Sequence, residues 1–167
     1  MKQVHVLSAV ICATIFSVFS HQLSAATPTA DKYTDSASYA YESTEKSLVK
    51  SYDKMIQVLK NGFDDVCGDT FCEGDYSNLQ SIEFLCGVEE GTGRITSCTW
   101  TFAGTMSIVN GKTGQVEKTG AIFNCPIRVN ATLQDLIKIV NDKSYDFEET
   151  VLPGMKESVY DSLTTCI

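Results

Sequence analysis

The sequence predicts an α+β domain with a long N-terminal helix, an antiparallel meander of three to four strands, two C-terminal helices and three disulfides. Apolar residues recur at three- and four-residue spacing from Leu48 to Phe63, as on one face of a helix. Two later stretches alternate apolar and polar residues around glycine-containing turns, a pattern typical of hairpin strands. Six of the seven cysteines follow residue 26, an even number that indicates disulfides in an exported chain.

Residues 1–26 have the pattern of a secretory signal peptide. Lys2 supplies a short positive region, a mostly apolar run follows, and Ser24-Ala25-Ala26 places small residues at the cleavage position. The apolar run is shorter than the roughly 20 residues that a membrane-spanning helix needs. We expect cleavage after residue 26, a flexible leader over 27–38 and a single α+β domain over 39–167. The mature protein would then be periplasmic or secreted, without a membrane anchor.

The first helix of the domain is predicted from Tyr41 to Asn61. Its lysines lie off the apolar stripe, as expected for a helix with one buried face. We expect Asn61-Gly62 to end the helix, because glycine readily takes the left-handed conformation found after a helix C-terminus. The stripe comprises Leu48, Val49, Tyr52, Met55, Ile56, Leu59 and Phe63.

The first predicted hairpin joins Leu79–Val88 to Arg94–Gly104. If it is symmetric about Thr92, Cys86 lies opposite Cys98, and directly opposed residues point to the same side of a sheet. This favours a Cys86–Cys98 disulfide. On the first strand, the residues expected to share the core face are Ile82, Phe84, Cys86 and Val88.

The second predicted strand continues to Val109, and the turn NGKTG leads into a third strand, Gln115–Val129. We expect a bulge or bend at Gly104, where the alternation can change phase. A hairpin centred near Lys112 would place Gly104 opposite Gly120. Two facing glycines would form either a plain kink or a gap that a ligand or another backbone could approach.

The remaining cysteines suggest two further disulfides. Cys67 and Cys72 can close a small loop, and Cys125–Cys166 would then tie the last strand to the C-terminal helix. Pairing of Cys67 or Cys72 with a strand cysteine is the alternative.

Two helices are predicted after the strands. Thr132 with Asp135 resembles a capping box at the start of a short amphipathic helix. We expect Leu152–Gly154 to open the last helix. Its apolar stripe comprises Met155, Val159, Leu163 and Cys166.

The histidine content and the net charge of the chain restrict the functions that it can have. Both histidines, His5 and His21, lie in the predicted signal peptide, so the mature chain would lack catalytic triads with histidine and histidine zinc sites. The net charge is −8, and loss of Lys2 makes it −9. Phosphates would be repelled, which argues against nucleic-acid binding. The charge suits a basic protein partner, or solubility alone. We expect neither enzymatic activity nor a cofactor.

The loop from Cys67 to Asn78 carries the candidate site. Its composition allows calcium binding, although the spacing differs from that of an EF-hand. A redox dithiol is disfavoured, because nearby acids oppose thiolate formation. A carboxylate-dependent hydrolase could use a pair such as Asp69 and Asp75. The candidate calcium ligands are Asp64, Asp65, Asp69, Glu73, Asp75 and Asn78.

Protein recognition is the favoured interpretation of this loop. Aromatic side chains make good anchors, and a disulfide that orders the loop lowers the entropy lost on binding. We expect an exported binding protein of the inhibitor or immunity type, with a calcium-binding protein and a hydrolase as alternatives. The candidate partner-binding residues are Asp69, Phe71, Glu73, Asp75 and Tyr76.

Overall fold

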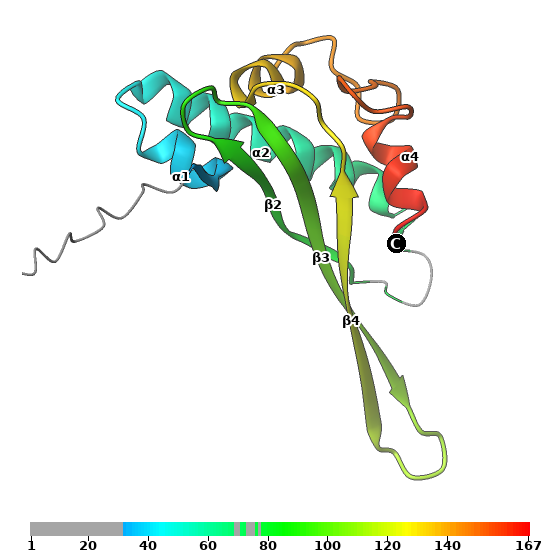
Figure 1. The fold of residues 1–167 in the computed structure, drawn as a ribbon. Helices are drawn as coiled ribbons and strands as arrows, with labels where there is room; N and C mark the ends of the chain where they lie inside the picture. Colours follow the sequence, from blue (N-terminus) through cyan, green and yellow to red (C-terminus); the bar gives the residue numbers. More distant parts are fainter. Residues whose placement is uncertain (1–31, 69–70, 73–75, 77) are drawn as a thin grey trace, which may run out of the picture. The chain divides into compact units, whose positions relative to one another are not determined.

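The computed structural model describes residues 32–68, 71–72, 76 and 78–167. The predicted signal peptide and residues 27–31 lie outside this part. The α+β fold agrees with the prediction (Figure 1). In chain order the elements are β1 (Tyr33–Asp35), α1 (Ser36–Tyr41), α2 (Lys46–Cys67), β2 (Gln80–Glu89), β3 (Ile95–Val109), β4 (Val116–Ile127), α3 (Leu133–Val140) and α4 (Val159–Thr164).

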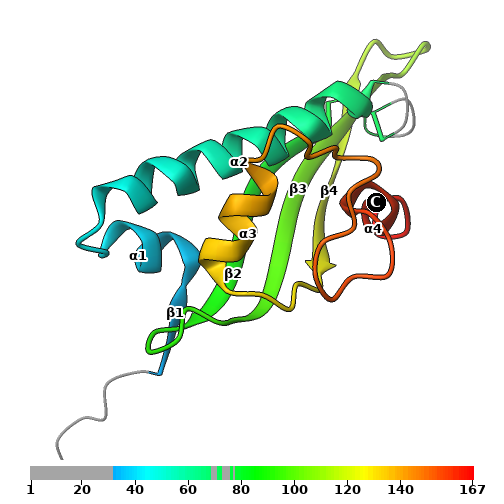
Figure 2. The same ribbon diagram turned by 90° about the horizontal axis from the view of Figure 1, so that it is seen from above.

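The four strands form one antiparallel sheet in the order β1-β2-β3-β4. The helices lie on one face of it, with α2 the longest (Figures 1 and 2). Between the two layers, Phe63 of α2 lies with its ring centroid 4.5 Å from Phe102 and 6.1 Å from Trp100. This aromatic cluster is the centre of the core.

Within the range expected as a leader, Tyr33 to Ser38 form β1 and the start of α1. Tyr33 to Asp35 pair with Glu89 to Gly87 of β2. The carboxylate of Asp35 accepts the backbone N–H of Ser38 at 2.8 Å and caps α1. This backbone bond and the one from the Ser38 hydroxyl lower the pKa of Asp35, because both favour its charged form.

Helix α2 begins later than predicted and continues through Gly62 to Cys67. A Cβ at Gly62 would lie 2.7 Å from the Phe147 ring. The glycine therefore provides room for an aromatic ring to cross the helix and does not end it. The predicted apolar stripe is otherwise correct at its buried positions, Leu48, Tyr52, Met55, Leu59 and Phe63.

The β2–β3 hairpin has the predicted central register, with Cys86 opposite Cys98. Two irregularities flank this region, between Ser81 and Glu83 and between Gly87 and Val88. The first of them leaves Ile82 without a partner in the ladder and exposed to solvent. The prediction that Ile82 shares the core face was therefore wrong, because an extra residue reverses the alternation of side chains.

Strands β3 and β4 pair without interruption from Cys98–Ile127 to Val109–Val116. Gly104 lies opposite Ala121, and Gly120 opposite Thr105. The predicted register was off by one residue because an even number of residues separates Val109 from Val116. The expected phase change at Gly104 is absent, and burial alternates from Cys98 through Gly104.

The C-terminal part follows the predicted order with one shift. Thr132 caps α3, its hydroxyl accepting the N–H of Asp135 at 3.1 Å. The last helix begins at Val159 rather than at Leu152, because Gly154 turns the chain with a φ of 90°. Ser158 then provides the N-cap, accepting the N–H of Asp161 at 3.1 Å.

The three disulfides join the predicted pairs, Cys67–Cys72, Cys86–Cys98 and Cys125–Cys166. Three disulfides in a chain of this size indicate an oxidising compartment. Within the described residues, no helix combines the length and apolar character needed to cross a membrane.

Candidate functional site

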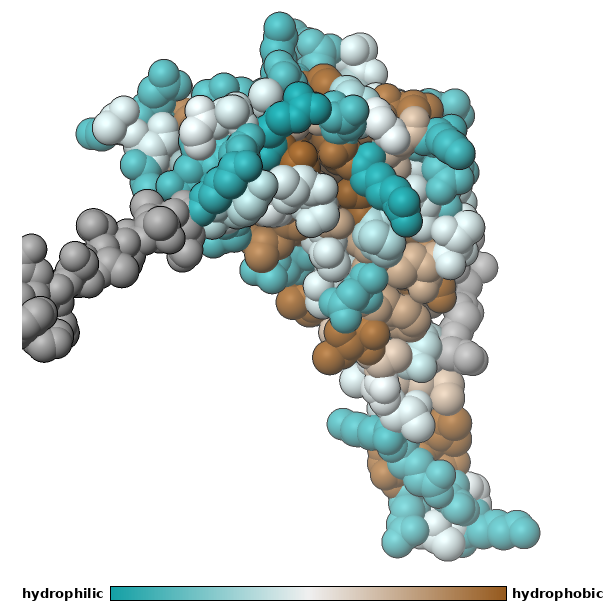
Figure 3. All heavy atoms as spheres, in the orientation of Figure 1, coloured by the Kyte–Doolittle hydropathy of each residue, from teal (hydrophilic) through white to brown (hydrophobic). Residues whose placement is uncertain are grey.

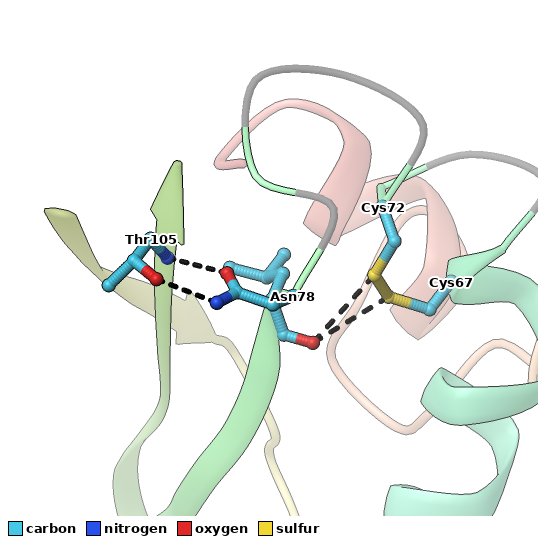
Figure 4. The surroundings of a disulfide bond; sticks show 5 residues. Cys67, Cys72, Asn78 and Thr105 are labelled. Carbon is cyan, nitrogen blue, oxygen red and sulfur yellow. Dashed lines mark hydrogen bonds between the residues drawn. A yellow bond between two sulfur atoms is a disulfide. The ribbon is translucent and has the colours of Figure 1, made fainter. Parts of the chain in front are cut away.

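The loop between α2 and β2 is held at its base by a disulfide. The Cα atoms of Cys67 and Cys72 are 5.0 Å apart, and the N–H of Cys72 donates to the carbonyl of Cys67 at 2.7 Å. The carbonyl oxygen of Leu79 lies 3.7 Å from the Cys72 sulfur, which brings the far end of the loop to the same point (Figure 4). The loop therefore leaves and re-enters the fold at one place.

Asn78 attaches the end of the loop to β3. Its amide nitrogen donates to the hydroxyl of Thr105 at 2.6 Å, and its amide oxygen accepts the Thr105 N–H at 2.6 Å (Figure 4). The β2–β3 ladder ends at Gln80 and Ala103, so this side chain extends the pairing beyond the backbone. Both polar groups of the Asn78 amide therefore take part in this attachment.

The two aromatic residues of the loop, Phe71 and Tyr76, are half-buried against the core. The Phe71 ring stacks on Phe63 at 5.5 Å and meets the edge of Tyr160 at 5.7 Å. Tyr76 meets Phe123 edge-on at 5.6 Å. The aromatic rings thus pack Phe71 and Tyr76 onto the domain, whereas the sequence suggested them as anchors for a partner. The acids Asp69, Glu73 and Asp75 lie outside the described residues.

Tyr76 also occupies the space beside Gly104. A Cβ at Gly104 would lie 3.0 Å from the Tyr76 Cβ and 3.1 Å from the Leu79 side chain. The gap beside Gly104 that could have received a ligand is therefore filled by Tyr76 and Leu79.

Beyond the loop, further acids come from two segments that are remote in sequence. Asp64 and Asp65 are exposed on the last turns of α2, and Glu148 and Glu149 are exposed on the segment after α3. The contact between Phe147 and Gly62 brings these segments together, and Figure 2 shows the segment running beside the second half of α2. We call Asp64, Asp65, Asp146, Glu148 and Glu149 the acidic end of the domain.

Local hydrogen bonds fix the geometry of the segment after α3. The carboxylate of Asp146 accepts the backbone N–H groups of Glu148 and Glu149 at 2.9 and 3.1 Å. Earlier in the segment, hydrogen bonds from the hydroxyl and N–H of Ser144 lower the pKa of Asp142. In the sequence, the signal that could have revealed the contact of this segment with α2 is Phe147, a large apolar residue among acids.

The acidic end lacks the features of a metal site. Among the described residues, no three His, Cys, Asp or Glu side chains converge on a point that could hold a metal ion. Among the described residues, Lys32 and Glu89 form an ion pair with their nitrogen and oxygen atoms 2.8 Å apart, and neither residue belongs to the acidic end. Exposed carboxylates produce a negative surface potential. Such a surface attracts cationic groups.

Comparison with known proteins adds no further guide, since no family model, curated protein or solved structure matches this chain.

Proposed function

We propose that this chain is an exported protein-recognition domain, of the inhibitor or immunity type, that binds a basic protein through the acidic end and the adjoining loop. After cleavage at residue 26 it would act in the periplasm or outside the cell. The supporting observation is the packing of Phe147 against Gly62, which adds the exposed acids of a second segment to those at the end of α2.

The contacts that attach the loop to the domain favour tight binding. A disulfide, two packed aromatic rings and the Asn78–Thr105 bonds restrict the loop before any partner arrives. Less conformational entropy is then lost on association, so more of the interaction free energy contributes to affinity. In the sequence, Asp69, Glu73 and Asp75 lie between or next to these anchored residues.

The negative charge of the acidic end favours a basic partner. A negative surface accelerates encounter with a positive one and repels acidic proteins, and the effect weakens as salt screens it. Such an interface should therefore bind best at low ionic strength.

The test is capture of partners from the periplasm or medium of the source cells at low salt. The variant Asp64→Lys with Glu148→Lys and Glu149→Lys reverses three charges of the acidic end. The matched control reverses three exposed acids elsewhere, at Glu42, Glu45 and Glu90. Both variants change the net charge equally, and neither removes a hydrogen bond that the fold uses.

We expect a captured basic protein to bind the first variant about tenfold or more weakly, because each reversal removes an attraction and adds a repulsion. The control should retain most of the affinity. Equal losses in both variants would show that binding depends only on net charge, and capture of no protein at low salt would contradict the proposal.

A further inference from the structure

Strands β3 and β4 extend well beyond the rest of the sheet. Pairing of β2 with β3 ends at Gln80–Ala103, while β3 and β4 remain paired as far as Val109–Val116. We call residues 104–121 the arm. Figure 1 shows it projecting past the helices as a two-stranded ribbon. In the described part of the chain β4 is the last strand of the sheet, so its outer edge has no strand beside it.

The arm and its base expose an apolar strip on the face turned away from the helices. Val109 pairs with Val116, and Ala103 pairs with Ile122, so each pair points to one side. Val109 and Ala103 are an even number of residues apart and share that side. Val116 is 58% exposed, Val109 64% and Ile122 71%. Figure 3 shows hydrophobic residues on the surface of the projecting ribbon.

We propose that a second copy of this chain occupies the outer edge of β4. The two β4 strands would pair antiparallel about a twofold axis at Thr119, and the two arms would form a four-stranded sheet. This goes beyond the proposed function and uses a surface separate from the acidic end.

The residue pattern of β4 favours this register. A twofold axis between antiparallel strands places one residue opposite its own copy. With Thr119 at the axis, Val116 lies opposite Ile122 of the second copy. Each such contact completes an apolar row across four strands, formed by Val109, Val116, Ile122 and Ala103. Two rows arise by symmetry, and each covers side chains that are exposed in the single copy.

Charges are also compatible with this register. Glu117 would lie opposite Ala121, and Lys118 opposite Gly120. An axis at Glu117 or at Lys118 would instead oppose two like charges, which destabilises a sheet. An axis at Gly120 would place Lys118 against the apolar Ile122. The axis at Thr119 therefore combines apolar contact with separated charges.

The same register uses only the free part of the edge. Paired residues would run from Gly114 to Asn124 and stop before Cys125. Cys125 is where the C-terminal segment joins β4, through the disulfide to Cys166 and the packing of α4 on β4. Because the strands are antiparallel, the two domains would lie at opposite ends of the shared sheet.

Cysteine cross-linking of the purified protein tests the register. Opposed residues have Cα atoms about 4.5–5.5 Å apart, within disulfide reach, so Thr119→Cys should give a covalent dimer on a non-reducing gel. Glu117→Cys on the same face is the matched control. Its two copies would be offset by four residues, roughly 13 Å, and should not cross-link. Peptide mapping checks that the native disulfides are intact. Cross-linking of both variants, or of neither, would overturn the register.

Sedimentation of unmodified protein and of two lysine variants tests the dimer itself. Ile122→Lys should raise the dissociation constant of the dimer about a hundredfold, since symmetry places the lysine in both apolar rows. The matched control is Ile82→Lys, at an exposed apolar residue outside the rows, which should sediment as the unmodified protein does. A monomer at about 100 μM for the unmodified protein, or equal effects of the two variants, would overturn the proposal.

Discussion

The two halves of β3 and β4 show how differently one ladder of strands can be used. At the body end Trp100 is 1% exposed, whereas on the same face of the arm Ile108 is 52% exposed. The backbone pairing is continuous between them. The difference is in what lies beside the two strands. At the body end these are β2, helices and disulfides, whereas along the arm β2 no longer pairs with β3, and the loop reaches Gly104 and Thr105 at the base of the arm.

This comparison shows that an apolar residue on the inner face of a strand is buried only where another element covers it. A hairpin with two strands is marginally stable on its own in water. The arm is instead an extension of a ladder that the body already holds. We therefore expect the stability of the domain to depend on the body and to be almost independent of the arm.

Trp100→Ala should have the largest effect on stability. The indole packs against Phe63, Phe84, Phe102 and Phe147. Truncating such a residue costs about 3–5 kcal/mol of unfolding free energy, because contacts are lost and a cavity forms. Ile108→Ala in the arm should cost less than about 0.5 kcal/mol. Urea unfolding followed by circular dichroism measures both, since Trp100 is the sole tryptophan. Similar losses at the two positions would show that the arm is covered in the free protein.

Removing the Cys125–Cys166 disulfide should have the next largest effect. It links residues 41 apart in sequence, and closing a loop of that length restricts the unfolded chain by about 4 kcal/mol. Replacing both cysteines by alanine should lower the free energy of unfolding by about this amount.

The matched comparison is Cys67→Ala with Cys72→Ala, which opens a loop with a separation of 5. The same relation gives about 2 kcal/mol for it. Denaturant titration of the two variants checks the ranking. A larger loss for the short loop would mean that the Cys67–Cys72 bond stabilises the native contacts of the loop directly.

Shortening the arm should have the smallest effect. Residues 106–119 are replaced by Asn-Gly, which favours the turn of a two-residue hairpin, so that Thr105 and Gly120 remain paired. The free energy of unfolding should stay within about 0.5 kcal/mol, because no core residue is removed. The melting temperature of the shortened chain, measured at a concentration where the unmodified protein is monomeric, checks this expectation. A chain that no longer folds would show that the arm supports the body.

The helical and strand periodicities of the apolar residues were sufficient to predict most of the fold. Both hairpins, the three disulfide pairs and the Thr132 cap could be predicted, because each depends on residues close in sequence or directly opposed in a ladder. The predictions for Gly62 and Gly104 were wrong, because Gly62 lies against the ring of Phe147 and Gly104 against Tyr76 and Leu79, residues that local spacing does not place there. The candidate site was predictable only at its loop, since the acids after α3 reach it through a tertiary contact.

Local spacing in the sequence was sufficient to predict α2, the strands β2 to β4, the two later helices, most of the faces that they bury and the cysteine pairs. It did not predict β1 and α1, which begin within the expected leader. Tertiary structure decided where those patterns take effect. In the folded chain, α2 continues past Gly62, and a bulge exposes Ile82 to solvent. The rings of Phe71 and Tyr76 pack against the core, and Ile108 of the arm remains exposed. The physical reason is that burial depends on which surface reaches a side chain, and a contact such as Phe147 with Gly62 joins residues too distant in the chain for any local pattern to record.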